Sequence, residues 1–195
     1  MLRLIAGLSN PEKKYIRTRH NVGALFVEFF SKNFGNTLKK NNRFLGKIDI
    51  LCFGKERIFL FIPFVHMNCN GMAISRLSRF YHIHPKEILI VHDELDIPVG
   101  SSKIKIGGGH NGHKGVLDTE ENLKSSNFYR LRIGVGRPRK NEKISDFVLG
   151  VPNKKDQKLI FNAINRSASY LHLFIQHEIF QFSKIQNHIN SIRSI

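Results

Sequence analysis

Short apolar runs alternate with amphipathic stretches along the chain, and no internal repeat or low-complexity linker interrupts the pattern. Apolar runs bounded by turn residues predict buried strands, and their alternation with helical patterns favours an α/β fold. The predicted strands are Leu2–Gly7, Gly46–Phe53, Arg57–Ile62, Glu87–His92, Ser102–Ile106 and Tyr129–Val135. Gly54 and Lys55 stand between the second and the third of them and predict a hairpin turn.

Apolar side chains recur at helical spacing between and after these strands. The predicted helices cover Asn21–Phe34, Gly71–Tyr81 and His113–Leu123, and a longer one follows Pro152. Beyond about Gln176 the periodicity weakens, so we expect the tail to fray. A chain of 195 residues is long enough for one core of native density, and we therefore expect residues 1–195 to form a single domain.

A scattered set of polar side chains lies in short segments beside the predicted strands. Asn10 lies in GLSNP, His20 in TRHN, Asn68 in HMN and Asp93 in VHDELD. In open α/β sheets, ligands bind at the loops beyond the carboxyl ends of the strands. We therefore expect these side chains to meet in one cleft.

His20 is the candidate general base of this set. It precedes a predicted helix, whose positive end disfavours the imidazolium and helps to keep the ring neutral near pH 7. Asp93 could hold one ring nitrogen of His20, fix its tautomer and stabilise the imidazolium that forms. Asn10 and Asn68 offer amide groups that can hold a substrate carbonyl without adding charge.

Taken alone, each of these residues is more often a helix cap or a turn residue than a catalytic group. The combination of these residues favours a catalytic role over a structural one. No serine stands in a nucleophile elbow, so water is the expected nucleophile.

The chain is strongly basic, with 31 Lys and Arg against 15 Asp and Glu and a formal net charge of +16. Such a charge attracts polyanions and favours a nucleic-acid partner. The alternative is compositional, because the chain is also rich in Phe, Ile and Asn, as expected from an A/T-biased genome, which raises the Lys content whatever the partner. The charge alone leaves both explanations open.

The apolar runs stay below the roughly 18 residues that predict a membrane span. The N-terminus reaches Asn10 and Pro11 too early for a signal peptide, so we expect a cytoplasmic protein without a membrane partner. Cys52 and Cys69 lack the spacing of a zinc site, and we expect free thiols and no structural metal.

Several longer segments carry these residues in a fixed order. They are GLSNPEKKYIRTRHNVG (7–23), HMNCNG (66–71), HDELDIPVG (92–100), KIKIGGGHNGHKG (103–115), RLRIGVGRP (130–138) and FVLG (147–150). Together, and in register over almost the whole chain, they resemble bacterial peptidyl-tRNA hydrolase.

This resemblance implies a single-domain α/β/α sandwich in which a mixed, twisted sheet is flanked by helices. It implies a monomeric enzyme that needs no cofactor. The implied reaction is hydrolysis of the ester between a peptide and the 3′ ribose of tRNA, which recycles peptidyl-tRNA dropped from or stalled on ribosomes.

The resemblance also implies roles for individual residues. By position, His20 is the catalytic base, Asp93 is its partner, and Asn10 separates peptidyl from free aminoacyl substrates. The positions that match substrate-binding residues of the family are Tyr15, His66, Met67, Asn68 and Lys114. The positions that match its tRNA phosphate contacts are Lys103, Lys105 and Arg132.

Two further features have alternative interpretations. The Gly107–Gly109 run lets the backbone approach a ligand closely, or it is a flexible turn between a strand and a helix. A basic cluster beside the proposed site extends the phosphate track, or it is a solvated charge cluster. It consists of Lys13, Lys14, Arg17 and Arg19.

The chain departs from the family pattern at four places. GGGHGGHNG stands here as GGGHNGHKG, so that a glycine becomes Asn111 and a substrate-binding asparagine becomes Lys114. A protonated lysine donates hydrogen bonds but cannot accept them. His66 replaces a phenylalanine, and Glu12 replaces a glycine and needs a backbone conformation that it tolerates. None of these changes removes a proposed catalytic group, so we expect activity at a lower rate.

Two alternatives belong to other classes. The first is a catalytically impaired tRNA- or RNA-binding protein on the same fold, which Lys114 favours. The second is a hydrolase of small esters or amides that does not bind RNA. A steep fall of substrate affinity with salt would exclude the second, because it reports the release of counterions from phosphates.

Overall fold

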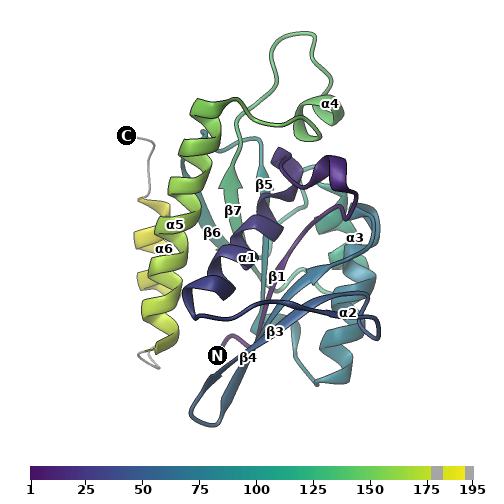
Figure 1. The fold of residues 1–195 in the computed structure, drawn as a ribbon, viewed down its shortest axis with the longest axis vertical. Helices are drawn as coiled ribbons and strands as arrows, with labels where there is room; N and C mark the ends of the chain where they lie inside the picture. Colours follow the sequence, from purple (N-terminus) through teal and green to yellow (C-terminus); the bar gives the residue numbers. More distant parts are fainter. Residues whose placement is uncertain (177–181, 192–195) are drawn as a thin grey trace.

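The computed structural model describes residues 1–176 and 182–191. Its centre is a seven-stranded mixed sheet with the strand order β2-β3-β4-β1-β5-β7-β6 (Figure 1). The strands are β1 (Leu4–Gly7), β2 (Lys39–Asn41), β3 (Gly46–Phe53), β4 (Glu56–Pro63), β5 (Ile88–Glu94), β6 (Ser102–Ile106) and β7 (Tyr129–Gly134). The central strands β4, β1, β5 and β7 run parallel, whereas β2, β3 and β6 join them by antiparallel pairing.

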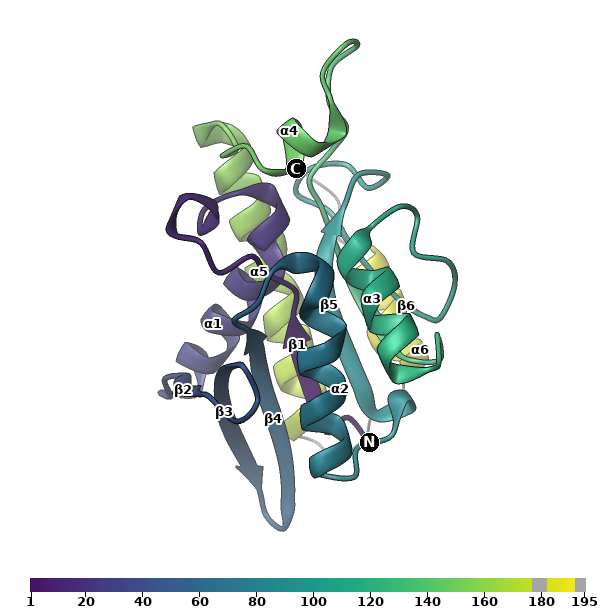
Figure 2. The same cartoon turned by 90° about the vertical axis from the view of Figure 1, so that its right-hand side faces the viewer.

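Helices cover both faces of this sheet (Figures 1 and 2). They are α1 (Val22–Asn33), α2 (Asn70–Phe80), α3 (Lys114–Leu123), α4 (Ile144–Val148), α5 (Lys154–Gln176) and α6 (Phe182–Asn190). Side chains of α1, α5 and α6 pack on one face, and those of α2 and α3 pack on the other. The predicted α/β/α sandwich with a mixed sheet is therefore confirmed. No helix within the described residues is both long and apolar enough to cross a membrane.

The central strands are apolar because they are buried on both faces. In β5, Leu89 and Val91 belong to the core cluster under α1 and α5, whereas Ile88 and Ile90 belong to the cluster under α2 and α3. All four side chains are fully buried. Successive side chains of a strand point to opposite faces, so a strand between two helical layers needs a continuous apolar run.

The predicted strands lie within two residues of the observed ones at each end. The hairpin turn at Gly54 and Lys55 is confirmed, since Phe53 pairs with Glu56 and Gly54 has a φ of 58°. One difference bears on the site. Asp93 was expected in a loop, but β5 continues to Glu94 because β7 pairs with it along that length, and Asp93 lies opposite Ile133 in the ladder.

Strand β2 and helix α4 were not predicted from the sequence. Strand β2 is a short polar segment, KKN, that pairs with β3 at the edge of the sheet and carries no apolar alternation. Helix α4 has only five residues, too few for a helical period to show.

The expectation of a frayed tail is wrong for residues 182–190, which form α6. Ile189 is fully buried against the sheet. Asn190 accepts a hydrogen bond from the backbone N–H of Ile104, and Gln186 donates one to the carbonyl oxygen of Ile104. Helix α6 thus supplies hydrogen-bond partners to the backbone groups of Ile104 on the outer edge of β6. Helical periodicity in the sequence does not reveal such an interaction. The rest of the tail, 177–181 and 192–195, lies outside the described residues.

Helix α1 packs unusually close to the sheet, and two glycines make this possible. A Cβ atom at Gly7 would lie 2.1 Å from the carbonyl oxygen of Gly23. A Cβ atom at Gly23 would lie 2.3 Å from the carbonyl oxygen of Val91. The start of α1 is therefore pressed against β1 and β5, just beyond His20 in the sequence.

We expect Gly7→Ala to destabilise the fold by about 3 kcal/mol, because the added methyl group forces backbone apart in a packed core. Urea denaturation followed by circular dichroism measures this change. Gly109→Ala is the matched control, since a Cβ atom there meets nothing within 4 Å. Equal stability of the two variants would contradict the close approach.

Candidate active site

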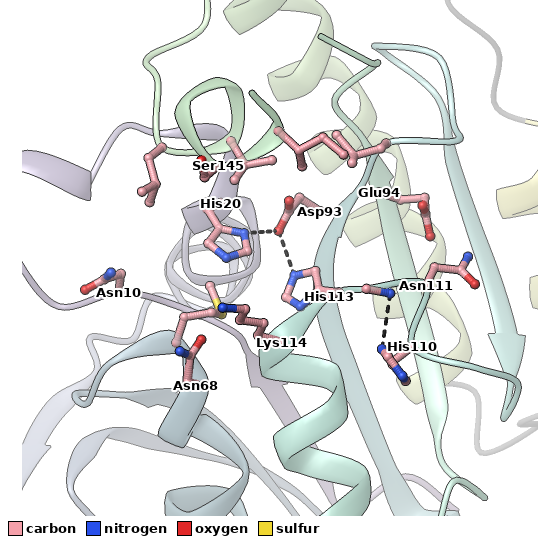
Figure 3. A pocket seen from close by; sticks show the side chains of 16 residues that line it. Asn10, His20, Asn68, Asp93, Glu94, His110, Asn111, His113, Lys114 and Ser145 are labelled. Carbon is pink, nitrogen blue, oxygen red and sulfur yellow. Dashed lines mark hydrogen bonds and ion pairs between the residues drawn. The ribbon is translucent and has the colours of Figure 1, made fainter. Parts of the chain in front are cut away.

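A cavity of about 400 Å³ lies at the carboxyl ends of β1, β4 and β5 (Figure 3). It collects side chains from the segments that follow these strands, from the turn before α1, and from the start of α3. Residues of α4 and Leu149 line it as well. The structure brings together there Asn10, His20, Met67, Asn68, Asp93 and Lys114.

Asp93 is the centre of the polar network in this cavity. Its carboxylate is only 3% exposed, and its Oδ1 atom lies 2.9 Å from Nδ1 of His20 and 2.9 Å from Nε2 of His113. A carboxylate only accepts hydrogen bonds, so each of these ring nitrogens carries a proton. Figure 3 shows the two rings on either side of Asp93.

These hydrogen bonds divide the two histidines by role. Nδ1 of His113 accepts a hydrogen bond from the backbone N–H of Val116, which makes His113 the N-cap of α3. Both nitrogens of His113 are thereby occupied. His20 donates through Nδ1, and its Nε2 makes no hydrogen bond within the described part of the chain. His20 is therefore the ring that can take a proton from a molecule in the cavity.

No role for His113 was predicted from the sequence. The residue stands in the glycine-rich segment KIKIGGGHNGHKG, where two histidines occur three positions apart in an otherwise glycine-rich run. That pair of titratable residues was an available signal. Its contact with Asp93 is nonetheless a long-range one that the sequence does not specify.

Asp93 sets the protonation of His20. Burial by itself lowers the pKa of His20, but the charge of Asp93 and the hydrogen bond to it outweigh burial and raise this pKa above the ordinary 6.5. The expectation that the helix start favours the neutral ring is therefore wrong in direction. A direct ionic hydrogen bond outweighs the partial charge of a helix terminus.

Asp93 itself stays ionised. Burial alone would raise its pKa, but the charges of His20 and His113 and their hydrogen bonds lower it well below the ordinary value. His92 lies behind the network, with its ring 4.9 Å from that of His113, and its Nδ1 atom donates to the backbone carbonyl of Asp93. Burial lowers the pKa of His92 far below 6.5, so this ring is neutral and adds no competing charge.

Two buried asparagines hold the loops that carry the other polar groups. The side chain of Asn21 bonds both the N–H and the C=O of Asn10, at 2.8 and 2.9 Å. Asn70 accepts from the N–H of Ser9 and donates to the carbonyls of Ser9 and His66. These bonds tie the segment after β1 to the segment after β4.

Because both backbone groups of Asn10 are hydrogen-bonded to Asn21, only the side chain of Asn10 remains available to a ligand. Its Oδ1 atom is buried and has no hydrogen-bond partner within the described residues. Buried polar atoms are nearly always paired. An unpaired acceptor at the wall of a cavity indicates a place for a donor N–H group of a ligand.

Arg19 belongs to the basic cluster beside the site, but it lies inside the protein and not on a phosphate track. It is 9% exposed, its guanidinium lies over the ring of Phe147, and it donates to the carbonyl oxygens of Phe147 and Gly150. Desolvation lowers the pKa of Arg19, opposed by the nearby charge of Asp156. Arg19 thus fixes the turn that carries His20 to the segment around α4. Lys13, Lys14 and Arg17 are exposed.

Tyr15 and His66 are not among the residues that line the cavity. They belong to an exposed cluster centred on Glu12, which lies 3.0 Å from the ammonium group of Lys14 and 3.8 Å from the ring of His66. Lys14 in turn lies over the ring of Tyr15. Glu12 has a φ of −64° and a ψ of 134°, so an ordinary extended backbone accommodates the change from glycine.

The other change from glycine in the family pattern is also accommodated. Asn111 has a φ of 50°, in the left-handed region that glycine adopts freely. Asparagine tolerates this region better than most residues. Asn111 lines the cavity beside His110 and Lys114.

Four cations share one face of β6 and β7. Lys103 lies opposite Arg132 in the ladder, and Lys105 lies opposite Arg130. Arg132 is paired with Glu94 at 2.8 Å, and burial followed by the charges of Arg130 and Arg132 lowers the pKa of Lys105. None of the four residues lines the cavity, and three of them, Lys103, Lys105 and Arg132, reach the surface and form a separate basic patch.

Arg130 shapes the glycine run instead of facing solvent. Its guanidinium is 2% exposed and donates to the backbone carbonyls of Gly107, Gly108 and Gly109. Gly107 and Gly108 both have positive φ angles. The run is therefore a turn fixed by a buried cation, and it leads directly to the His113 cap.

His20, Asp93 and His113 also offer ligand atoms within 4.8 Å of one another, close enough to hold a metal ion. All three atoms are already joined by the two hydrogen bonds described above. A metal ion would have to displace both protons, so the geometry favours the hydrogen-bonded network. The two cysteines, Cys52 and Cys69, are free and exposed, as expected.

Comparisons with known proteins agree with this geometry. The family model described as peptidyl-tRNA hydrolase matches residues 4–194. The peptidyl-tRNA hydrolase of Baumannia cicadellinicola is 45% identical over 91% of this chain and 93% of that protein, and that of Mannheimia succiniciproducens is 41% identical over 99% and 98%. The crystal structure of peptidyl-tRNA hydrolase from Acinetobacter baumannii superposes with a TM-score of 0.92 at 38% identity, covering 100% of this chain and 97% of that one.

We expect Asp93→Asn to lower the pKa of His20 from above 6.5 to below it, because burial then acts without the opposing charge. Proton–nitrogen NMR of the imidazole nitrogens measures this titration. Asp96→Asn is the control, since Asp96 is exposed and pairs with Arg137. An unchanged His20 titration in Asp93→Asn would refute the assignment.

Proposed function

The chain belongs to the peptidyl-tRNA hydrolase family, and we propose that His20, oriented by Asp93, activates the water that cleaves its substrate. The enzyme hydrolyses the ester that joins a peptide to tRNA. The observation that supports this assignment most is the shared Oδ1 atom of Asp93, which uses one nitrogen of His20 and leaves the other facing the cavity. The same bond supplies the raised basicity of the ring.

In the proposed reaction, Nε2 of His20 takes a proton from water as the water oxygen attacks the ester carbonyl carbon. Asp93 stabilises the imidazolium that forms. When the tetrahedral intermediate collapses, the bond to the ribose 3′ oxygen breaks, and the imidazolium returns its proton to that oxygen. The products are tRNA and a free peptide carboxylic acid, which releases its proton to solvent and becomes the carboxylate, with His20 neutral again.

The amides around His20 orient the substrate in this proposal. The unpaired Oδ1 atom of Asn10 accepts the N–H of the peptide bond next to the ester. Asn68 holds the ester carbonyl, and Met67 packs against the substrate with its flexible thioether. His113 is a positioning residue, since it fixes Asp93 and caps α3 without a free nitrogen of its own.

The tRNA body binds outside the cavity in this proposal. Lys103 and Lys105 on β6, with Arg132 beside them, form a basic surface for phosphates, and Tyr15 and His66 lie at a second exposed cluster for the 3′ end. Because Glu94 already pairs with Arg132, the lysines carry most of the available charge. The alternative of a catalytically impaired RNA-binding protein finds no support.

We further propose that the protein acts as a single-domain monomer in the cytoplasm, without a cofactor. One sheet runs from β2 to β6, and its helices share two continuous core clusters, which supports a single domain. Its substrate is formed where translation takes place, which supports the location.

We expect His20→Ala to reduce cleavage of N-acetyl-aminoacyl-tRNA about a thousand-fold, because both ring nitrogens of His113 are occupied and the ring of His92 is buried away from the cavity. Release of the labelled acyl group measures the rate, and filter binding should give nearly unchanged tRNA affinity. His82→Asn is the control, since His82 is exposed and has a positive φ that asparagine tolerates. A His20→Ala enzyme as fast as the parent would reject His20 as the base.

We expect the double change Lys103→Ala and Lys105→Ala to raise KM while leaving kcat nearly unchanged, because these side chains lie outside the cavity. The slope of log affinity against log salt should fall by about 1 to 2. Lys39→Ala with Lys40→Ala is a matched control, since these lysines lie on the edge strand β2 at the opposite side of the sheet. The same slope in both double variants would place the tRNA elsewhere.

A further inference from the structure

We propose that Lys114 acts as a charge filter that makes this enzyme reject esters with a free α-ammonium group. The inference rests on the proposed function and concerns the choice between peptidyl-tRNA and aminoacyl-tRNA. Both substrates carry the same ester on the same tRNA. They differ at the α-nitrogen, which is a neutral amide in peptidyl-tRNA and an amine, protonated near pH 7, in aminoacyl-tRNA.

Lys114 is placed to sense this difference. It is the first residue of α3, directly after the His113 cap, and it lines the same cavity as Asn10, His20 and Asn68. Figure 3 shows its side chain extending from the helix toward the space between these residues. The ammonium group makes no hydrogen bond or ion pair within the described part of the chain.

The carboxylates that face the cavity do not offset this charge. Asp93 is already bonded to His20 and His113, and Glu94 is paired with Arg132. The other titratable side chain that lines the cavity is His110. A second cation entering the cavity would therefore meet the positive charge of Lys114 without a free carboxylate to bind it.

A substrate must bring its α-nitrogen into this region. The ester carbon has to lie beside His20, and the α-nitrogen is only two covalent bonds away from that carbon. The acceptor at hand is the unpaired Oδ1 atom of Asn10. An ammonium group can also donate to this acceptor, because a charged donor forms a stronger hydrogen bond than an amide does.

An unfavourable charge adds to the rejection of the ammonium group, and Lys114 supplies it. Two like charges several ångströms apart, in a cavity open to water, repel enough to change a rate about tenfold. The effect falls on aminoacyl esters alone, since an amide nitrogen carries no charge.

The test compares kcat/KM for three substrates near pH 6.5, on the parent enzyme and on Lys114→Met. The substrates are N-acetyl-aminoacyl-tRNA, aminoacyl-tRNA, and α-hydroxyacyl-tRNA, in which a neutral hydroxyl replaces the amine. We expect the preference for N-acetyl over aminoacyl substrate to fall about tenfold in Lys114→Met. The preference for N-acetyl over α-hydroxyacyl substrate should change less than about twofold, because neither substrate is charged there.

Two further variants separate charge from structure. Lys114→Arg keeps the charge and should keep the preference of the parent. Lys154→Met makes the same chemical change at the first residue of α5, outside the cavity, and should also behave as the parent. Raising the pH to about 8.5 deprotonates most of the α-amine, so the parent and Lys114→Met should converge in their preference. Titration of His20 affects all three substrates and cancels in the ratios.

Other outcomes would overturn the inference. An unchanged preference in Lys114→Met would remove Lys114 as a filter. A proportional loss on all three substrates would mean that Lys114 stabilises an oxyanion or a phosphate instead. A parent enzyme that cleaves none of the substrates would contradict the proposed function itself, which is a different failure from a parent that cleaves N-acetyl substrate with a Lys114-independent preference.

Discussion

The site depends on one constraint, which is that the buried carboxylate of Asp93 must accept hydrogen bonds from neighbouring donors. Asp93 is almost inaccessible to solvent, and burying an ionised carboxylate is strongly unfavourable unless donors surround it. Two imidazole N–H groups converge on a single oxygen atom of Asp93, and their approach fixes the tautomer of both rings. Because one ring also caps α3, the same network joins the geometry of the proposed catalytic site to the folding of a helix. The free nitrogen of His20 is a consequence of this arrangement.

The backbone around Asp93 is held rigidly enough to maintain these distances. Asp93 lies inside a paired strand, so its position is set by the sheet and not by a loop. The turn that carries His20 is held against the sheet by the close contact of Gly7 with Gly23, and Arg19 ties it to the segment near α4. The buried side-chain amides of Asn21 and Asn70 likewise hold the segments after β1 and β4 in place. Reactive groups held by packed elements in this way need little reorganisation when substrate binds.

The large positive charge of the chain is not one uniform feature. Arg19 and Arg130 donate to backbone carbonyls inside the protein, where they shape loops, and Arg132 is paired with Glu94 on the neighbouring strand. The lysines of β6 lie outside the cavity, in the surface that we propose binds phosphates. Lys114 differs from both groups, because it puts an unpaired charge into the cavity itself. Net charge in the sequence could not separate these three uses, since they differ in burial and in partners.

The sequence by itself determined the architecture, because strands buried on both faces require continuous apolar runs and amphipathic helices require a helical period. Its motifs also contain the candidate site residues Asn10, His20, Asn68 and Asp93. The order of these motifs along the chain indicated the family. The sequence did not place Asp93 within a strand, reveal His113 as its second donor, or predict α6 against the edge of β6. The direction of the His20 pKa shift was likewise decided only by the folded structure. Each of these features depends on a contact between residues far apart in the chain. Local patterns of polarity do not specify which distant residue forms a hydrogen bond with a buried polar group.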